Sequence, residues 1–261
     1  MRDLAQTNLQ LYEQLMELSW EPADLAGVRQ AYELACELFS GRYRPSGKTF
    51  VAHVVGTASC VAAVEGRVDL VKAAMLHAAY EQGDFGLRDR RERRRAVVRS
   101  AIGTDAEAIV STYTALPWSP ASIEDLREHL SDQTALIRDV LVVRLANEVD
   151  EHLDGGARVA DRSGGPLYRD DVVDAITELA VELGHPHLAD LLERVRSQGD
   201  EPSIPGELRS TLSASVLRPP ASYRPAFRRS GHSAWRRLRR ELGRIPGARA
   251  LYRRIAGATR I

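Results

Sequence analysis

Apolar side chains recur at helical spacing through the first 200 residues of the chain. Behind Pro22, a residue that suits the first turn of a helix, Leu25, Val28, Tyr32 and Ala35 fall on one face. The same periodicity predicts helices from Leu4 to Leu18, from Pro22 to Leu38, and at 49–65, 68–83, 88–102, 105–116, 134–153, 168–183 and 186–198. No strand-like alternation exceeds four residues, so we expect an all-α body.

Glycines and small polar residues mark several ends of these helices. Gly66 separates the third and fourth helices, and Gly103 closes the arginine-rich one. Thr104 or Asp105 is the expected N-terminal cap of the helix that follows, and Gly155–Gly156 is the expected stop of the helix at 134–153.

The composition changes after Gly199. We predict a helical domain over 1–200, a linker rich in proline, serine and arginine over 201–232, and a basic amphipathic helical tail over 233–261. In the basic tail, an apolar stripe that includes Trp235 and Leu238 runs opposite many arginines.

The net charge of zero conceals two oppositely charged parts. Residues 201–261 hold fourteen arginines and three acids, a balance of +11, so residues 1–200 carry −11. The basic tail is therefore expected to dock on the acidic body or on a partner protein. An anionic membrane surface is the second choice and nucleic acid the third.

The longest apolar runs, the first ten residues and the cysteines indicate the cellular compartment. No run approaches the roughly 18 apolar residues that a membrane-spanning helix needs, and the polar start MRDLAQTNLQ does not resemble a secretory signal. Two cysteines lie in apolar helical patterns and are expected to be thiols. We expect a bacterial-type cytoplasmic protein, with contact to a membrane surface through the basic tail as an alternative.

Three segments carry the candidate chemistry. His53 lies on one apolar helix, and His77 lies on the next with Glu81 one turn later. The segment VVRLANEVDEH supplies Asn147, Asp150 and Glu151. Imidazole and carboxylate groups fixed on several helices suit a divalent metal, for which the candidate ligands are His53, His77, Glu81 and Asp150. The alternative for each histidine is a hydrogen-bonded residue of the core.

The order and spacing of these segments resemble the HD superfamily, in particular the hydrolase domain of enzymes that make and degrade (p)ppGpp. In RYRPSGKTFVAHVVGTASCVA, Arg44, Ser46, Gly47 and His53 stand where that family has an arginine, a Ser-Gly pair and its first histidine. In AAMLHAAYEQ, His77 and Glu81 match, and IGTDAEAIV is similar to the family's next element. The resemblance covers about residues 25–155 and implies an HD-domain-like helical bundle.

The departures from that family concern the metal. The resemblance implies two histidines and two aspartates as ligands, whereas Ala78 and Asn147 stand at the aspartate positions, and Gln82 replaces a further aspartate. Loss of two negative charges beside a dication weakens its binding. A divalent metal cofactor is therefore possible, and the sequence does not decide whether one binds. A less characterised branch with the pattern H-x-x-G-T and F-H-x-x-Y is closer, and Gly56, Thr57 and Tyr80 fit it together with the two histidines.

Two functions follow from the resemblance. The first is a hydrolase acting on a nucleotide or another phosphorylated small molecule, with Glu81 as general base or metal ligand and His77 as acid or base. Its anionic ligand would be bound by the residues Arg44, Ser46, Lys48, Tyr80, Asn147 and Glu151. The second is a non-catalytic module that senses a ligand or binds a partner. The two differ in whether His53, His77 and Glu81 face one water-accessible pocket. The run RDRRERRR at 88–95 is interpreted as a charged helix face.

Overall fold

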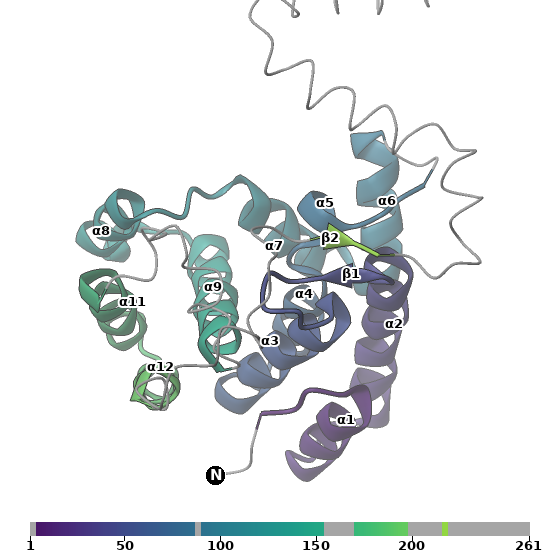
Figure 1. Cartoon of the computed structure of the whole chain (residues 1–261), viewed down its shortest axis with the longest axis horizontal. Coiled ribbons are helices and arrows are strands. Elements are labelled where there is room, and N and C mark those ends of the chain that lie inside the picture. The colour runs from purple at the N-terminus through teal and green to yellow at the C-terminus, as the bar shows by residue number, and fades with distance from the viewer. Residues whose placement is uncertain (1–3, 87–89, 154–169, 198–215, 219–261) are drawn as a thin grey trace, which may run out of the picture. The chain divides into compact units, whose positions relative to one another are not determined.

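The computed structural model of the chain describes residues 4–86, 90–153, 170–197 and 216–218. The chain divides into two compact units, 1–217 and 218–261, and the description below concerns the first. Its helices are α1 Asn8–Glu17, α2 Pro22–Phe39, α3 Phe50–Val64, α4 Val68–Leu76, α5 Ala79–Gln82, α6 Arg91–Ile102, α7 Thr104–Ala115, α8 Pro120–Glu128, the 3-10 turn Leu130–Asp132, α9 Ala135–Leu153, α11 Asp170–Glu182 and α12 Pro186–Ser197. The prediction of an all-α body is confirmed (Figure 1).

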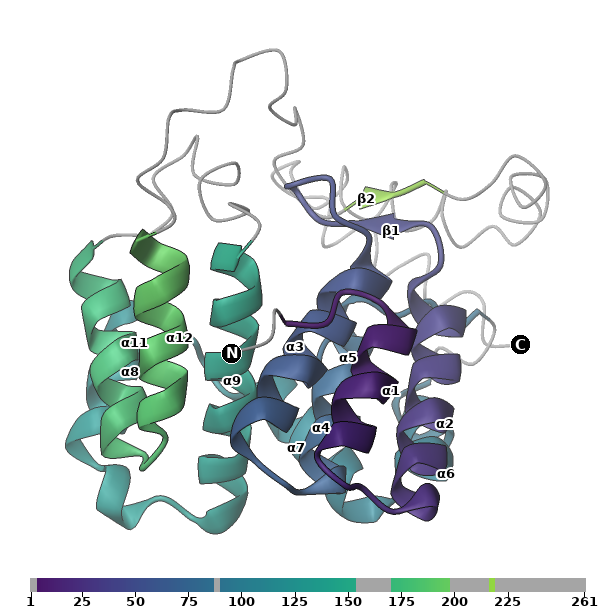
Figure 2. The ribbon, with the colours of Figure 1, turned by 90° about the horizontal axis from the view of Figure 1, so that it is seen from below.

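Helix α3 lies at the centre of this unit because almost all of its surface is apolar. It packs most extensively against α4 and α9, and α7 contacts both of those helices. Helices α8, α11 and α12 lie beside α9 on one side, whereas α1 and α2 lie on the other side (Figure 2). The buried core runs through all these helices from Ala5 to Val195. This arrangement carries α3, α4 and α9 to one place, as the candidate site requires.

One predicted helix is interrupted. Where the sequence predicted a helix at 68–83, α4 ends at Leu76 and the short α5 begins at Ala79. The His77 Nδ1 atom lies 2.8 Å from the Ala74 carbonyl oxygen, which is the acceptor that the amide of Ala78 would use in a continuous helix. The imidazole therefore competes with the backbone at the point where the helix breaks.

Two further differences concern helix ends. Neither Thr104 nor Asp105 caps α7, because the residue that precedes the helix is Gly103, whose φ of 89° favours glycine. Helix α8 was missed, although Ser119 forms a capping box with Ser122 and Pro120 occupies the first turn.

The strands are short. Within the described ranges β1 Arg42–Tyr43 pairs antiparallel with β2 Val216–Leu217, which lies inside the segment predicted as a linker. The rest of that linker, the basic tail and the Gly155–Gly156 stop lie outside the described residues. None of the described helices is both long and apolar enough to cross a membrane.

Candidate functional site

Asp150 on α9 is the centre of a buried polar cluster. Its carboxylate is 1% exposed and meets side chains from three other parts of the chain. The Nδ1 atom of His53, on α3, lies 2.7 Å from Asp150 Oδ2. Lys48, in the loop before α3, places its Nζ 2.7 Å from Oδ1 and 2.9 Å from Oδ2. Gln6 donates a longer hydrogen bond of 3.4 Å to Oδ1. We call these four residues and Arg44 the His53–Asp150 cluster.

The partners of His53 fix the position of its proton. Arg44 Nη1, which can only donate, lies 3.1 Å from His53 Nε2. Nε2 is therefore the unprotonated nitrogen, and Nδ1 carries the proton that is donated to Asp150. Arg44 also forms an ion pair with Glu151 and lies over the Phe50 ring, 5.5 Å from its centroid.

Both members of the His53–Asp150 pair have shifted pKa values. Burial, reinforced by the positive charge of Arg44, lowers the pKa of His53 to about 4 despite its bond to Asp150. Burial opposes ionisation of Asp150, but His53 and Lys48 outweigh burial and hold its pKa below the ordinary value. At neutral pH the cluster therefore holds a neutral imidazole beside a buried carboxylate–ammonium pair.

A series of ring contacts continues from His53 toward α7. The His53 and His77 rings meet edge to face at a centroid distance of 5.2 Å, and His77 contacts Tyr113 at 5.0 Å. The guanidinium carbon of Arg144 lies over the Tyr113 ring, 3.6 Å from the ring centroid. Burial, followed by the neighbouring His53, lowers the pKa of His77 well below its ordinary value. His77 is thus a neutral residue packed among aromatic rings, with 2% of its surface exposed.

The other predicted site residues do not all reach this cluster. Glu81 is exposed, and Ser46 is half-buried, where its Oγ accepts a hydrogen bond from the amide of Lys48. Asn147 is buried on α9, on the same helix as Asp150. Tyr80 belongs to a different cluster, described below. His53, His77 and Glu81 therefore do not share one exposed surface, because the two histidines are buried and the glutamate is not.

A divalent metal does not fit the His53–Asp150 cluster as it is arranged. Both carboxylate oxygens of Asp150 accept from Lys48, and Nε2 of His53 accepts from Arg44, so the lone pairs that a metal needs are engaged. Two positively charged side chains would also repel a dication. Among the described residues, no group of three or more His, Cys, Asp and Glu side chains is arranged to hold a metal ion. The assignment to His53, His77, Glu81 and Asp150 stays a prediction that this arrangement does not support.

Gly56 allows the close approach of α3 to this cluster. A Cβ atom at this position would lie 1.8 Å from Asp150 Oδ1 and 2.9 Å from Gln6 Nε2. Any side chain would therefore displace the carboxylate that His53 and Lys48 share. This contact gives a physical reason for the glycine of the H-x-x-G-T pattern.

A second buried carboxylate, Glu107 on α7, forms a separate cluster. Tyr80 donates a 2.7 Å hydrogen bond to Oε1, Arg95 donates to both oxygens at 2.7 and 2.9 Å, and Arg99 donates to Oε2 at 3.0 Å. Burial opposes ionisation of Glu107, but the hydrogen bonds from Arg95, Tyr80 and Arg99 outweigh it and lower its pKa to about 2. We call Glu107 and these three partners the Glu107 cluster.

Sequence reasoning missed this cluster and the roles of several residues in the first one. Glu107 is the acid that interrupts the apolar side of α7, and Arg95 and Arg99 share a face of α6, so both signals were present in the sequence. Nothing in the sequence pattern indicates Gln6 as a partner of Asp150, because the two residues are 144 positions apart.

The comparisons with known proteins add one match. A family model described as “Domain of unknown function (DUF6817)” matches residues 36–117, which is 82 of the 261 residues. The matched segment includes His53, His77 and Glu107 but ends before α9 and Asp150. No curated relative matches this chain.

Proposed function

We propose that this chain is a non-catalytic ligand-binding module built on an HD-type helical scaffold. The observation that carries the proposal is the state of the His53–Asp150 cluster. Its imidazole is neutral and buried, and its carboxylate is bound by Lys48. A catalytic acid or base must come within hydrogen-bond reach of the reacting group, and the predicted acid–base pair His77 and Glu81 is split between core and surface.

The charge of Lys48 supports this function. A metal site of two histidines and two carboxylates has a cation at its centre, and here an ammonium group contacts Asp150 in the core. The lysine side chain is 11% exposed and Asp150 is fully buried, so the pair is shielded from water. Breaking such a pair by removing one member is costly, by about 3–5 kcal/mol. In this function Lys48 therefore compensates the buried charge of Asp150.

The HD-type scaffold is supported by the convergence of the quoted motifs. Residues of RYRPSGKTFVAH, of AAMLH and of LANEVDE come from β1 and its loop, α3, α4 and α9, and they meet around His53. The resemblance predicts this meeting from the order of segments.

A hydrolase with a remodelled site is the second candidate. One observation favours it, because His53, His77 and Asp150 from three helices are in direct contact, with 5.2 Å between the imidazole centroids. That function requires a rearrangement that opens the cluster to water and frees Asp150 from Lys48.

Metal content and turnover distinguish the two functions. We expect elemental analysis of the purified full-length protein to find no stoichiometric divalent metal. We also expect no turnover of phosphomonoesters or pyrophosphate esters when Mn²⁺ or Mg²⁺ is added. Stoichiometric metal with turnover in the wild-type protein would overturn the proposal.

The variant His53→Asn provides the control for that measurement. Asparagine retains a donor toward Asp150, so the variant is expected to fold, and its circular dichroism spectrum checks this. Metal-dependent turnover that is present in the wild type and absent in folded His53→Asn would establish the hydrolase at this cluster.

A further inference from the structure

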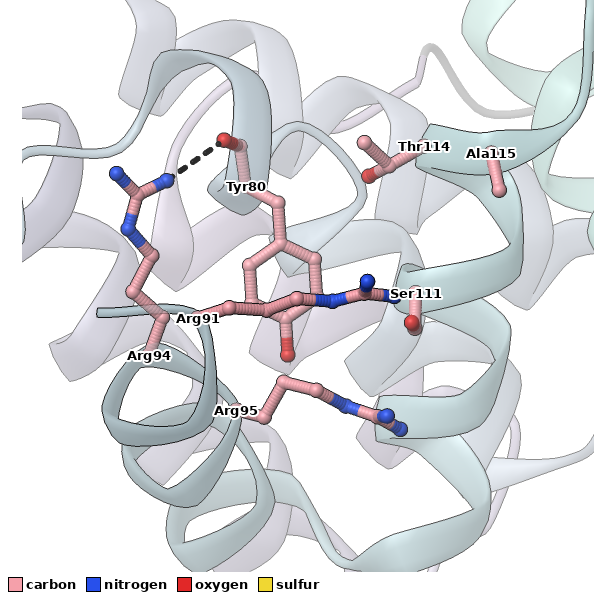
Figure 3. A pocket seen from close by; sticks show the side chains of 7 residues that line it. All are labelled: Tyr80, Arg91, Arg94, Arg95, Ser111, Thr114 and Ala115. Carbon is pink, nitrogen blue, oxygen red and sulfur yellow. Dashed lines mark hydrogen bonds between the residues drawn. The ribbon is translucent and has the colours of Figure 1, made fainter. Parts of the chain in front are cut away.

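A pocket of about 380 Å³ lies between α5, the first turns of α6 and the second half of α7. Its lining residues are Tyr80, Arg91, Arg94, Arg95, Ser111, Thr114 and Ala115 (Figure 3). The lining thus contains three arginines and three residues with a hydroxyl group, and none of the lining residues that the structure describes carries a carboxylate. The volume lies within the range of about 300–1,000 Å³ that small-molecule sites occupy.

Two of the three arginines are held in position by the protein. Arg95 forms the ion pair with the buried Glu107, and Arg94 donates to the carbonyl oxygen of Tyr80 at 3.3 Å while lying over the Phe85 ring. The Tyr80 hydroxyl is tied to Glu107 as well. The Glu107 cluster therefore holds Tyr80 and Arg95, two of the lining residues, in position before any ligand arrives. This order reduces the side-chain entropy that is lost on binding.

Arg91 differs from its neighbours. It is exposed and, within the part of the chain that the structure describes, it makes no hydrogen bond or ion pair. Figure 3 shows its side chain extending past the Tyr80 ring toward Ser111. Its guanidinium is thus available to a ligand at the mouth of the pocket.

The local charge favours an anion of more than one unit. Arg91, Arg94, Arg95 and Arg99 supply four positive charges, and Glu107, which stays ionised above a pKa of about 2, supplies one negative charge. These five groups carry a balance of +3, and none of the lining residues that the structure describes is acidic. The planar fork of the Arg91 guanidinium can bind two phosphate oxygens at once. Arg95 uses Nε and Nη2 for Glu107, so it can offer a phosphate its Nη1 group.

The non-polar part of the pocket indicates what accompanies the anion. The Tyr80 ring and the Ala115 methyl group face the same space as the arginines, together with the aliphatic stems of those arginines. A flat organic group can pack against the ring while an attached phosphate meets Arg91 and Arg95. Inorganic phosphate alone would leave this surface uncovered.

We propose that this pocket binds a small organic phosphate monoester, with its phosphate on Arg91 and Arg95 and its organic group on Tyr80. The inference deepens the proposed binding function by naming a site and a ligand class, and it rests on that function. The pocket is distinct from the His53–Asp150 cluster, because none of the five residues of that cluster lines it. The run RDRRERRR thus contains the cationic wall of a pocket, beyond a charged helix face.

The test measures binding of adenosine monophosphate to the full-length protein by titration calorimetry at one fixed salt concentration. Adenosine and inorganic phosphate are the comparison probes, and both are expected to bind at least about tenfold more weakly. Arg91→Ala is expected to weaken binding of the monophosphate by about tenfold or more. Because Arg91 is exposed and has no hydrogen-bond or ion-pair partner among the described residues, this variant is expected to keep the unfolding midpoint of the wild type.

The matched control is Arg93→Ala. Arg93 is exposed on the same helix and does not line the pocket, so the variant loses the same charge from the same segment. It is expected to bind within about twofold of the wild type. Equal losses of affinity in the two variants would contradict the proposed binding site, because they would mean that the ligand is attracted diffusely to an arginine-rich helix. Single-stranded oligonucleotide that binds more tightly than the monophosphate, with both arginines contributing, would indicate a nucleic-acid surface instead.

Failure of the pocket and failure of the proposed function give different results. Binding that neither arginine variant changes would place the ligand elsewhere and leave the non-catalytic function intact. No binding of either phosphate probe would overturn the ligand class alone. Metal-dependent turnover would overturn the proposed function whatever the pocket binds.

Discussion

The proton on His53 decides the character of the buried cluster. Because Arg44 can only donate, Nε2 of His53 must accept, and the single proton of the neutral ring lies on Nδ1 beside Asp150. A second proton would put a positive charge next to Arg44 and Lys48 in the core. This crowding of cations, added to burial, is why the pKa of His53 falls to about 4.

Stability should therefore fall on acidification. The ordinary pKa of 6.5 applies to the unfolded chain and about 4 to the folded protein, so the unfolded state takes up the proton first as the pH falls. The contribution of His53 is complete above pH 6.5 and is lost between 6.5 and 4. We expect a loss on the order of 3 kcal/mol in the free energy of unfolding across that window.

Urea unfolding at several pH values measures this, with His53→Asn as the reference because asparagine does not titrate. The variant should lose less stability than the wild type across the window. His77 and Asp150 titrate in both proteins, so only the difference between the two slopes belongs to His53. Parallel curves for the two proteins would contradict the assignment.

At the scale of elements, α3 and α9 approach closely because Gly56 has no side chain. The Asp150 carboxylate occupies the space that a Cβ atom would need, and the two helices share the polar cluster there. Alanine has a helix propensity about 1 kcal/mol better than that of glycine, so propensity alone would favour Gly56→Ala. Displacing a buried carboxylate that has three partners costs more than this gain.

Gly56→Ala is thus expected to lower the free energy of unfolding by about 2 kcal/mol or more. The control is Gly66→Ala, where a Cβ atom would meet nothing within 4 Å and the change should stay within about 0.5 kcal/mol. Chemical denaturation of both variants checks the contrast. A Gly56→Ala variant as stable as the wild type would mean that α3 and α9 can separate at little cost.

Elements with strong periodicity and clear ends were predicted well from the sequence. Helix α2 begins at Pro22 as predicted, and α3 and α9 lie within a residue or two of the predicted ranges. The break after Leu76 was not predictable from periodicity, because it coincides with a side-chain hydrogen bond of His77 to the Ala74 carbonyl oxygen, which the pattern of apolar residues does not reveal. The sequence analysis placed His53 and Asp150 in the same site, and the structure has them in contact. The contacts of Lys48 with Asp150 and of Tyr80 with Glu107 were not predicted, because they depend on how the elements pack.

At the scale of the whole molecule, the division into two compact units coincides with a division of charge. The unit 218–261 holds thirteen arginines and one acid, a balance of +12, so the unit 1–217 carries −12. The expected docking of the basic tail concerns residues outside the described ranges and stays a prediction. The buried core of the described residues ends at Val195, well before the boundary.

A chain that ends at residue 218 should therefore keep the stability of the first unit. It retains β2 and every apolar residue of the described core, so its free energy of unfolding is expected to lie within about 1 kcal/mol of the full-length value. Urea unfolding of both proteins at the same ionic strength tests this. A larger loss that an added 219–261 segment restores only at low salt would instead show electrostatic docking between the units.

The burial of Lys48 against Asp150 also affects how the protein reacts with reagents that modify lysine. The chain contains 261 residues but only two lysines, Lys48 and Lys72. The ammonium of Lys48 is held by both oxygens of a buried carboxylate, whereas Lys72 on α4 is partly exposed. Acylation needs an amine that a reagent can reach, and the Lys48 side chain is only 11% exposed, with its amine engaged by Asp150. A labelling reagent or an acyl-transferring enzyme directed at lysine therefore meets, in the folded protein, a single reactive side-chain amine at Lys72.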